Sequence, residues 1–463
     1  MMNNKPNQPS TPTTPSRDNF KTHLGVLAAT LGSAVGLGNI WKFPSLVGQS
    51  GGAAFVFVYI ICVLLIGIPV MVSEHVVGRA ARSNPVDAFK RLSASKFPWG
   101  IIGVMGILGS FLILSFYTEV AGWVLAYIPK AISGVILTTD AAAADQTFVD
   151  LITNPTASLA WQWIDLFIVG IIIASGVSKG IERTIKLLIP VLLLLLILVA
   201  IRSVTLPGAS EGLTFLFKPD LSKLTPSVIL GAMGLAFFKL SVGMGVMLTY
   251  GSYYPDSQDI PGNAIRVALS DVVIALLAGV AIFPAVFAYN FEPTSGPSLL
   301  FKTIPAVFAS MPLGNFFLIV FLVLTFVASI GAQVSLVEAL TTFLQERVDW
   351  PRKKVTLITV IGLLIFGSLA ALSNSTLSHI TIAGKNFFDL FDYLSSNVLL
   401  PLGGMLICLF IGWVWGKPNF ETALSNNGTL KNNRVINILF FLIKFISPVL
   451  ILLVFLNSIQ IIK

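Results

Sequence analysis

Long apolar runs alternate with short polar loops along almost the whole chain. A bilayer core needs about 20 apolar residues per helix, and the chain contains about eleven stretches of that kind. The pattern therefore predicts an all-α integral membrane protein. The predicted spans are 24–48, 53–78, 98–128, 162–178, 184–205, 226–252, 262–290, 314–345, 355–372, 387–415 and 435–461.

The charges in the loops predict how these helices are oriented. Basic side chains cluster after the second, fourth and eighth runs, and acidic ones after the third. Cytoplasmic loops carry an excess of Lys and Arg. We therefore expect a cytoplasmic N-terminus and, with eleven spans, an extracellular C-terminus. The basic residues are Arg79, Arg82, Lys90, Arg91, Lys96, Lys179, Arg183, Lys186, Arg347, Arg352, Lys353 and Lys354, and the acidic ones are Asp140, Asp145 and Asp150.

Composition narrows the class of protein further. Of the 463 residues 55% are hydrophobic and 11% charged, against about a quarter charged in soluble proteins. The net charge of +8 lies in loops, which does not indicate nucleic-acid binding. Two cysteines, Cys62 and Cys408, lie inside apolar runs, and there are three histidines. We therefore expect neither a metal centre nor a cofactor.

The ends and interruptions of the runs predict the domain organisation. Residues 1–16 are rich in Pro, Ser, Thr and Asn and are predicted to form a disordered cytoplasmic tail before a transporter domain at 17–463. Glycines interrupt the first run at 32–39 and the sixth at 241–245. Unwound backbone at membrane depth is tolerated where it lines a cavity.

Two broken helices five spans apart indicate inverted repeats around a central site. We expect repeats at 24–205 and 226–415 and an extra helix at 435–461. Close helix packing through small residues is the alternative explanation of the glycines.

Several long motifs resemble the neurotransmitter:sodium symporter family, in its bacterial, LeuT-like, eleven-helix form. They are GSAVGLGNIWKFP (32–44), GQSGGAAFVFVY (48–59), GIPVMVSEHVVGR (67–79), SKGIER (178–183), GMGVMLTYGSY (243–253) and AGVAIFPAVF (278–287). The resemblance covers nearly all of the chain after the tail. It implies a LeuT-type fold, alternating access, and a small amino acid or amine substrate driven by sodium and, in some members, chloride.

The resemblance implies a substrate site at the two breaks. The substrate carboxylate would meet the amides of Leu37 and Gly38 and the hydroxyl of Tyr117, since free amides at a helix break bind anions. The amine would meet the Ala34 and Phe238 carbonyls and the Ser241 hydroxyl. The remaining pocket is apolar, which favours an apolar or aromatic amino acid, although such residues can also be plain core. It comprises Ile113, Phe238, Met244 and Leu336.

At the first sodium site, this chain departs from the ligand pattern of the family. The Ala34 carbonyl, Asn39 and an acidic residue, Asp271, are present, but the hydroxyl position is Lys239. An intramembrane lysine needs a partner or a wet cavity, and Asp271 is the natural partner. The ammonium could replace sodium. Burial disfavours its charge, whereas Asp271 and a bound carboxylate favour it, so coupling to protons is a coherent hypothesis. The alternative is that Lys239 extends to the membrane surface.

At the second sodium site, this chain also departs from the ligand pattern of the family. Its carbonyl positions are Gly32, Val35 and Ala328, but the two hydroxyl positions are Gly331 and Ala332. A hard cation needs several oxygen ligands, so this site is predicted to be degraded. Chloride is not expected either, because two of its family ligand positions are Leu235 and Ala275, although Tyr59 is present.

Both gates of the family have counterparts. Lys42 would form the outer gate with Asp389 or Asp392, more weakly than the usual arginine because lysine lacks the bidentate fork. Arg17, Tyr253 and Glu346 match the inner gate. The intramembrane acids Glu74 and Glu338 are interpreted as structural hydrogen-bond acceptors, with a proton relay as the alternative.

We therefore interpret the chain as an amino acid transporter of a bacterial plasma membrane that has lost conventional sodium coupling. Its expected partners are an amino acid, the lipid bilayer and protons, with sodium less favoured and no nucleic acid. A uniporter or exchanger, and a sodium symporter with one residual ion site, remain open, as does a non-transporting amino acid sensor. An enzyme is not expected, because no nucleophile–base set is present. The oligomeric state is not predicted.

Overall fold

The computed structural model describes residues 20, 22–291, 299–348, 350–459 and 461. The tail predicted for 1–16 lies outside these residues. Apart from one isolated β-bridge between Ile382 and Lys385, the regular secondary structure of the described chain is helical. The predicted all-α class is therefore confirmed.

Within the described ranges, nine helices are long and apolar enough to cross a membrane, and a bent pair, His23–Ala34 with Gly38–Gln49, makes a tenth span. The pair bends by 48°. The predicted sixth run is divided into α11 (Pro226–Lys239) and α12 (Val246–Ser252), each too short to span alone. The nine continuous spans are Ala53–Ala81, Ile101–Ile132, Pro155–Ala174, Val177–Val204, Ile260–Ala288, Gly314–Val348, Arg352–Ala371, Phe387–Leu424 and Asn433–Asn457.

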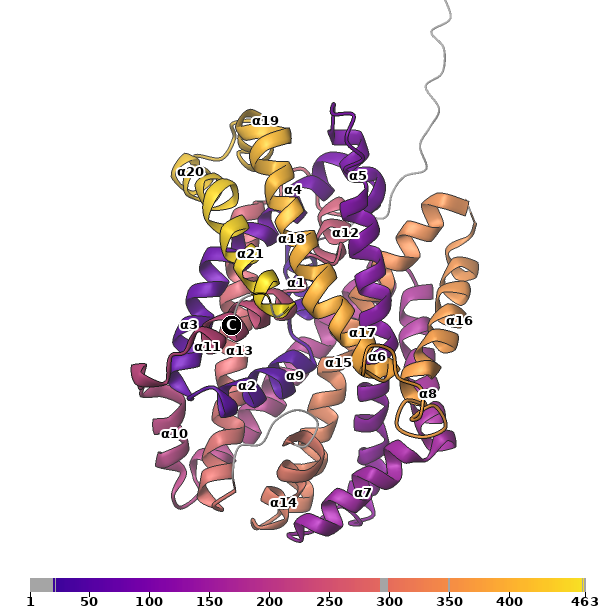
Figure 1. The fold of residues 1–463 in the computed structure, drawn as a ribbon, viewed down its shortest axis with the longest axis vertical. Coiled ribbons are helices and arrows are strands. Elements are labelled where there is room, and N and C mark those ends of the chain that lie inside the picture. The colour runs from indigo at the N-terminus through magenta and orange to yellow at the C-terminus, as the bar shows by residue number, and fades with distance from the viewer. Residues whose placement is uncertain (1–19, 21, 292–298, 349, 460, 462–463) are drawn as a thin grey trace, which may run out of the picture.

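The elements that build these spans are numbered along the chain. Figure 1 labels α-helices, and η denotes a 3₁₀- or π-helical segment. The first four spans contain α1 (His23–Ala34), η1 (Gly38–Lys42), α2 (Phe43–Gln49), α3 (Ala53–Cys62), η2 (Val63–Gly67), α4 (Ile68–Ala81), α6 (Ile101–Ile132) and α8 (Pro155–Ala174). The later spans contain η3 (Val177–Glu182), α9 (Arg183–Val204), α13 (Ile260–Ala288), α15 (Gly314–Val348), α16 (Arg352–Ala371), α17 (Phe387–Asp392), η6 (Tyr393–Leu399), α18 (Leu400–Leu409), η7 (Phe410–Trp415), α19 (Gly416–Leu424), α20 (Asn433–Phe441), η8 (Leu442–Ile446) and α21 (Ser447–Ser458).

Short helices occupy the loops at the two ends of the bundle. Figure 1 places α5 at the end that also carries α12 and α19, and α7, α10 and α14 at the opposite end. We call the first the basic end, because the clusters at 79–96, 179–186 and 347–354 lie in its loops, and the second the opposite end. The loop elements are α5 (Pro85–Leu92), α7 (Ala141–Thr153), α10 (Ala209–Phe217), η4 (Leu221–Lys223), η5 (Leu299–Thr303) and α14 (Ile304–Ala309).

Several helix boundaries differ from the pattern of apolar residues. The predicted span 162–178 is observed at Pro155–Ala174. It begins earlier because the Asn154 side chain accepts a hydrogen bond from the Ala157 amide and caps a polar first turn. The span predicted at 387–415 continues through Gly416 to Leu424. Hydropathy detects the apolar part of a helix and misses polar turns at its ends.

The break between α11 and α12 depends on backbone conformations that favour glycine. Gly243 and Gly245 have φ values of 82° and 73°, which glycine adopts without steric cost. A Cβ on Gly243 would lie 2.6 Å from the Leu400 carbonyl oxygen. Glu74, a buried residue of α4, accepts hydrogen bonds from the Gly243 and Leu248 amides, and so satisfies donors that the break leaves without helical partners.

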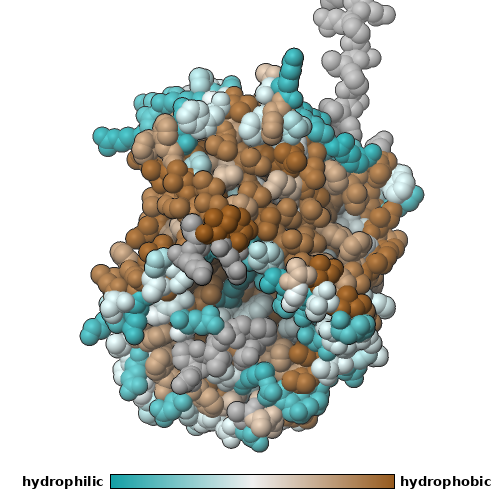
Figure 2. Space-filling model, viewed as in Figure 1, coloured by the Kyte–Doolittle hydropathy of each residue, from teal (hydrophilic) through white to brown (hydrophobic). Residues whose placement is uncertain are grey.

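The broken helices lie inside a shell of long helices. α6 and α15 pack along each other, and α12 packs against α4. Figure 2 shows an apolar band across the surface between ends richer in polar residues. This is the distribution expected of a helical bundle with a lipid-facing middle. The residues at the breaks after α1 and α11 are buried in the interior.

Candidate functional site

A small cavity of about 30 Å³ lies at the two helix breaks. Nearly all residues that the sequence predicted to bind substrate line this cavity. Three further residues that were not predicted to touch substrate also line it. Leu37 is the exception, since only its backbone takes part, through a hydrogen bond described below. The predicted lining residues are Ala34, Gly38, Ile113, Tyr117, Phe238, Lys239, Ser241, Met244 and Leu336, and the additional ones are Ser33, Gly36 and Ala332.

The hydroxyl of Tyr117 joins α6 to the break after α1. It accepts a hydrogen bond of 2.9 Å from the Leu37 amide. A Cβ on Gly36 would lie 2.8 Å from the Tyr117 hydroxyl and 3.0 Å from the Ala332 Cβ, so glycine allows this close approach. Backbone amides at a helix break, beside a tyrosine hydroxyl, can recognise a carboxylate.

The opposite wall of the cavity is held by serine hydroxyls. Ser241 donates a hydrogen bond of 2.9 Å to the Ser33 carbonyl, which connects the break after α11 to α1. Ser33 in turn donates to the Ser335 hydroxyl on α15 at 2.7 Å. The two breaks and α15 therefore meet around the same cavity, and the other lining side chains are mostly apolar.

Lys239 and Asp271 form a fully buried ion pair beside this cavity. The Lys239 Nζ lies 3.0 Å from Asp271 Oδ2, and neither side chain is exposed. Asn39 donates a hydrogen bond of 2.7 Å to the other carboxylate oxygen. Tyr59 donates to Asp271 Oδ2 at 3.1 Å and accepts from Lys239 at 3.1 Å.

The position of Lys239 in its helix also stabilises its charge. Lys239 is the last residue of α11, where the partial negative charge of the helix end favours a cation. Its Nζ lies 5.0 Å from the ring centroids of both Phe43 and Tyr59, within cation–π range. The lysine therefore points into the protein, and the alternative that it extends to the membrane surface does not hold.

The residues at the second predicted ion site offer few oxygen ligands. A Cβ on Gly331 would lie 2.4 Å from the Gly32 carbonyl oxygen, so α15 and α1 are in close contact there. A second small cavity at this point is surrounded by residues without a side-chain oxygen, and Ala332 faces the substrate cavity instead. This surrounding set is Gly32, Val35, Ile185, Leu188, Ile189, Leu192, Val327, Ala328 and Gly331.

At the opposite end, Lys42 covers the cavity. Its Nζ lies 3.8 Å from Asp392 Oδ1 and 3.9 Å from the centroid of the Phe238 ring, which lines the cavity. Asp389 is the other acid that the sequence offered. Within the described chain, the carboxylate at ion-pair distance from Lys42 belongs to Asp392.

At the basic end, a buried cluster joins α12, α15 and α16. Tyr253, which follows α12, donates a hydrogen bond of 2.7 Å to Glu338. Arg352, at the start of α16, forms an ion pair with the same carboxylate. Glu346 accepts hydrogen bonds of 2.9 and 2.8 Å from the amide and side chain of Asn84. Arg17, the third predicted gate residue, lies outside the described residues.

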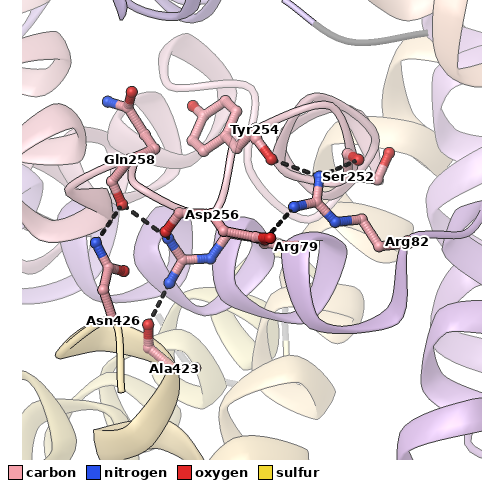
Figure 3. A network of polar contacts seen from close by, with 8 residues as sticks. All are labelled: Arg79, Arg82, Ser252, Tyr254, Asp256, Gln258, Ala423 and Asn426. Atoms are coloured by element: carbon pink, nitrogen blue, oxygen red, sulfur yellow. Dashed lines mark hydrogen bonds and ion pairs between the residues drawn. The ribbon is translucent and has the colours of Figure 1, made fainter. Parts of the chain in front are cut away.

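Two arginines at the end of α4 hold the connection between α12 and α13 (Figure 3). Arg79 donates to the carbonyls of Gln258, at 2.7 Å, and Ala423 in the last turn of α19. Arg82 donates to the Ser252 carbonyl at 3.1 Å and forms an ion pair with Asp256. Cations at helix C-termini are stabilised by the exposed carbonyls.

Sequence reasoning missed several of these contacts. Tyr59 entered only as a chloride ligand of the family, whereas here it bonds both Lys239 and Asp271. Arg79 and Arg352 were used to orient the helices, although Arg79 makes a buried hydrogen bond and Arg352 an ion pair with the fully buried Glu338. A basic residue directly at a predicted helix end is a signal that could have suggested a capping role.

Comparisons with known proteins agree with this architecture. The family model of the sodium:neurotransmitter symporter family matches residues 17–147 and 146–463. An uncharacterized sodium-dependent transporter of Bacillus subtilis, YhdH, is 42% identical over 95% of this chain and 97% of its own. One of Haemophilus influenzae is 37% identical over 96% and 98%.

A solved structure also matches almost the full length. The crystal structure of MhsT in complex with L-phenylalanine has a TM-score of 0.88 and 43% identity, over 96% of this chain and 100% of that chain. This match confirms the predicted LeuT-type fold.

Proposed function

The chain belongs to the sodium:neurotransmitter symporter family, a family of membrane transporters and not of enzymes, and we propose that it carries apolar or aromatic amino acids by alternating access. The mostly apolar lining of the central cavity supports this substrate class. The complex of the similar protein MhsT with L-phenylalanine supports it as well. Ile113, Met244 and Leu336 would surround the substrate side chain.

We further propose that Lys239, paired with Asp271, replaces the first sodium ion. The single observation that carries this proposal is the buried contact of 3.0 Å between Lys239 Nζ and Asp271 Oδ2. Sodium and an ammonium about 4 Å apart would repel by about 4 kcal/mol at an effective dielectric constant of 20. The lysine charge therefore makes a second cation at the same place unfavourable.

The substrate would complete this charge arrangement. Its carboxylate would meet the Leu37 and Gly38 amides, the Tyr117 hydroxyl and the Lys239 ammonium, and its amine the Ala34 and Phe238 carbonyls and the Ser241 hydroxyl. The apolar surroundings of the second ion position support loss of that sodium as well. Coupling to protons through Lys239 then supplies the driving force.

The same interpretation assigns the two gates and the orientation of the chain in the membrane. Lys42 with Asp392 would close the outer side, and Tyr253 and Glu346 with Arg17 the inner side. We place the N-terminus in the cytoplasm, the C-terminus outside the cell, and the chain in a bacterial plasma membrane. The repeats at 24–205 and 226–415, with an extra helix at 435–461, remain part of this proposal.

Uptake of radiolabelled L-phenylalanine into proteoliposomes tests the proposal, with sodium and pH gradients imposed separately. We expect saturable uptake that an inward proton gradient raises and a sodium gradient leaves unchanged. Lys239→Met should abolish the response to pH. Lys218→Met, which removes an exposed lysine that does not line the cavity, is the matched control. A pH response that survives in Lys239→Met would contradict the role of Lys239.

A conventional sodium symporter with one residual ion site is the second candidate. The Bacillus and Haemophilus relatives, both named as sodium-dependent transporters, favour it. It predicts steep sodium stimulation of the same uptake, whatever the pH gradient. Binding of L-phenylalanine without uptake under either gradient would indicate a sensor.

A further inference from the structure

A second lysine lies inside the last membrane span, remote from the transport site. It is level with Gly412, about one helical turn from the start of the polar helix α19. Lys444 belongs to η8 of the last span, Asn433–Asn457. Its Nζ lies 4.4 Å from the ring centroid of Trp413, with Phe445 at 5.5 Å and Phe440 at 5.9 Å. The ammonium is therefore surrounded by aromatic rings.

This aromatic group faces outward from the bundle. Trp413 is 61% exposed and Phe445 46% exposed, on a surface that consists largely of apolar side chains. Lys444 itself is half-buried. In a membrane, such a surface is covered by lipid rather than by water.

The close packing of two π-helical segments places these residues together. Gly412 belongs to η7 and faces η8, and a Cβ there would lie 3.0 Å from the Lys444 Cα. Glycine at this position brings the two backbones together, and Trp413 follows directly in the chain. π-helical segments inside α-helices are frequent at functional sites.

The charge of Lys444 has no acidic partner in the described part of the chain. Among those residues, no Asp or Glu lies within ion-pair distance of its Nζ. Charged side chains within a span normally pair or extend toward the membrane surface. Aromatic rings stabilise an ammonium only in part, so an anion is the missing component.

We propose that Lys444 and Trp413 bind the phosphate of an anionic phospholipid. The lysine supplies the positive charge, and Trp413 supplies an amphipathic ring of the kind that is enriched at the headgroup level. The exposed side chains of Phe441, Phe445 and Val449 along the same helix provide an apolar surface for the acyl chains. A zwitterionic lipid carries its own cation and would gain less from Lys444.

Quenching of tryptophan fluorescence by brominated phospholipids tests this site in the full chain. Brominated phosphatidylglycerol should quench the reconstituted protein preferentially over brominated phosphatidylcholine at equal mole fraction. One basic residue near an anionic headgroup corresponds to about a fivefold preference in lipid affinity. The preferentially quenched component should disappear in Trp413→Phe, which leaves the other seven of the eight tryptophans as background.

Variants of the lysine separate its charge from its packing. Lys444→Met should equalise quenching by the two lipids, Lys444→Arg should retain the preference, and Lys218→Met should behave as wild type. No preference in the wild-type chain, or a preference that survives in Lys444→Met, would overturn the proposal. Competition by millimolar inorganic phosphate would also overturn it, since a free anion would then occupy the site. The assay needs no transport, so its outcome is independent of the proposed function.

Discussion

At the scale of single residues, the central question is what stabilises a buried lysine. A lone charge in a membrane interior is costly, yet Lys239 is fully buried. Asp271 neutralises it, Tyr59 bonds both partners, and the end of α11 adds a favourable field. The pair is thus a compensated unit, and removing one member should cost more than removing both.

The stability of charge-neutral variants tests this residue-scale argument. Lys239→Met leaves the Asp271 carboxylate buried without its cation, a change that typically costs about 3–5 kcal/mol. Lys239→Met combined with Asp271→Asn removes both charges and keeps Asn39 and Tyr59 near a polar side chain. We expect the midpoint of thermal unfolding in detergent to be lower in either single variant than in the double variant. Equal midpoints in all three variants would mean that the two residues do not stabilise each other.

At the scale of elements, the site depends on how closely α1 and α15 approach. Gly331 faces the Gly32 carbonyl so closely that a side chain cannot enter without displacing one helix. The same contact explains why the second ion position lacks a hydroxyl: the glycine that removes the ligand also closes the gap. Loss of the ligand and tight packing are therefore one structural feature.

Alanine at position 331 measures the value of that contact. A Cβ forced against the Gly32 carbonyl should destabilise the protein by about 1–3 kcal/mol. Gly362→Ala is the matched control, because Gly362 lies inside α16 with nothing within 4 Å of an added Cβ, and alanine there should stabilise slightly. Thermal unfolding and phenylalanine binding are the measurements. A Gly331→Ala protein as stable as Gly362→Ala would show that α1 can move away from α15 at little energetic cost.

Glu74 acts on the other broken helix. Its carboxylate accepts from two amides at the break between α11 and α12, and each donor left unsatisfied costs about 1–3 kcal/mol. We expect Glu74→Ala to reduce phenylalanine uptake by at least about tenfold, since 1.4 kcal/mol is a factor of ten. Glu74→Gln, which keeps one acceptor oxygen, should retain more activity. Equal activity of the two variants would exclude a capping role.

At the scale of the whole molecule, much of the architecture can be predicted from the sequence. The apolar runs identify the spans because hydropathy depends on local composition, and the glycines at 243 and 245 identify a break because few residues adopt those backbone angles. Contacts between distant segments are different. The place of Tyr59 between Lys239 and Asp271, and of Ala423 beside Arg79, depends on how helices pack. No local pattern records that arrangement.

The two ends of the molecule hold the central cavity by contacts of different strength. The Lys42–Asp392 pair at the opposite end is partly exposed, and such pairs contribute about 0–1 kcal/mol. At the basic end, Glu338 is fully buried and bonds Tyr253 and Arg352. Charge-assisted, buried contacts of that kind are stronger, so the basic end should be the more firmly closed one.

Thiol labelling of a buried position can test this asymmetry. In a Cys62→Ala, Cys408→Ala background, Ser335→Cys places a thiol beside the Ser33 hydroxyl, next to the cavity. Arg352→Met removes the cation from Glu338 and should raise the labelling rate of this thiol by about tenfold, if the lost pair is worth about 1.4 kcal/mol.

Lys42→Met weakens the opposite end. In an alternating-access cycle the two ends open at each other's expense, so labelling from the basic end should then fall below that of the background protein. A rise of equal size in both variants would indicate general loosening of the bundle, and unchanged labelling in Arg352→Met would show that the Glu338 cluster does not close the basic end.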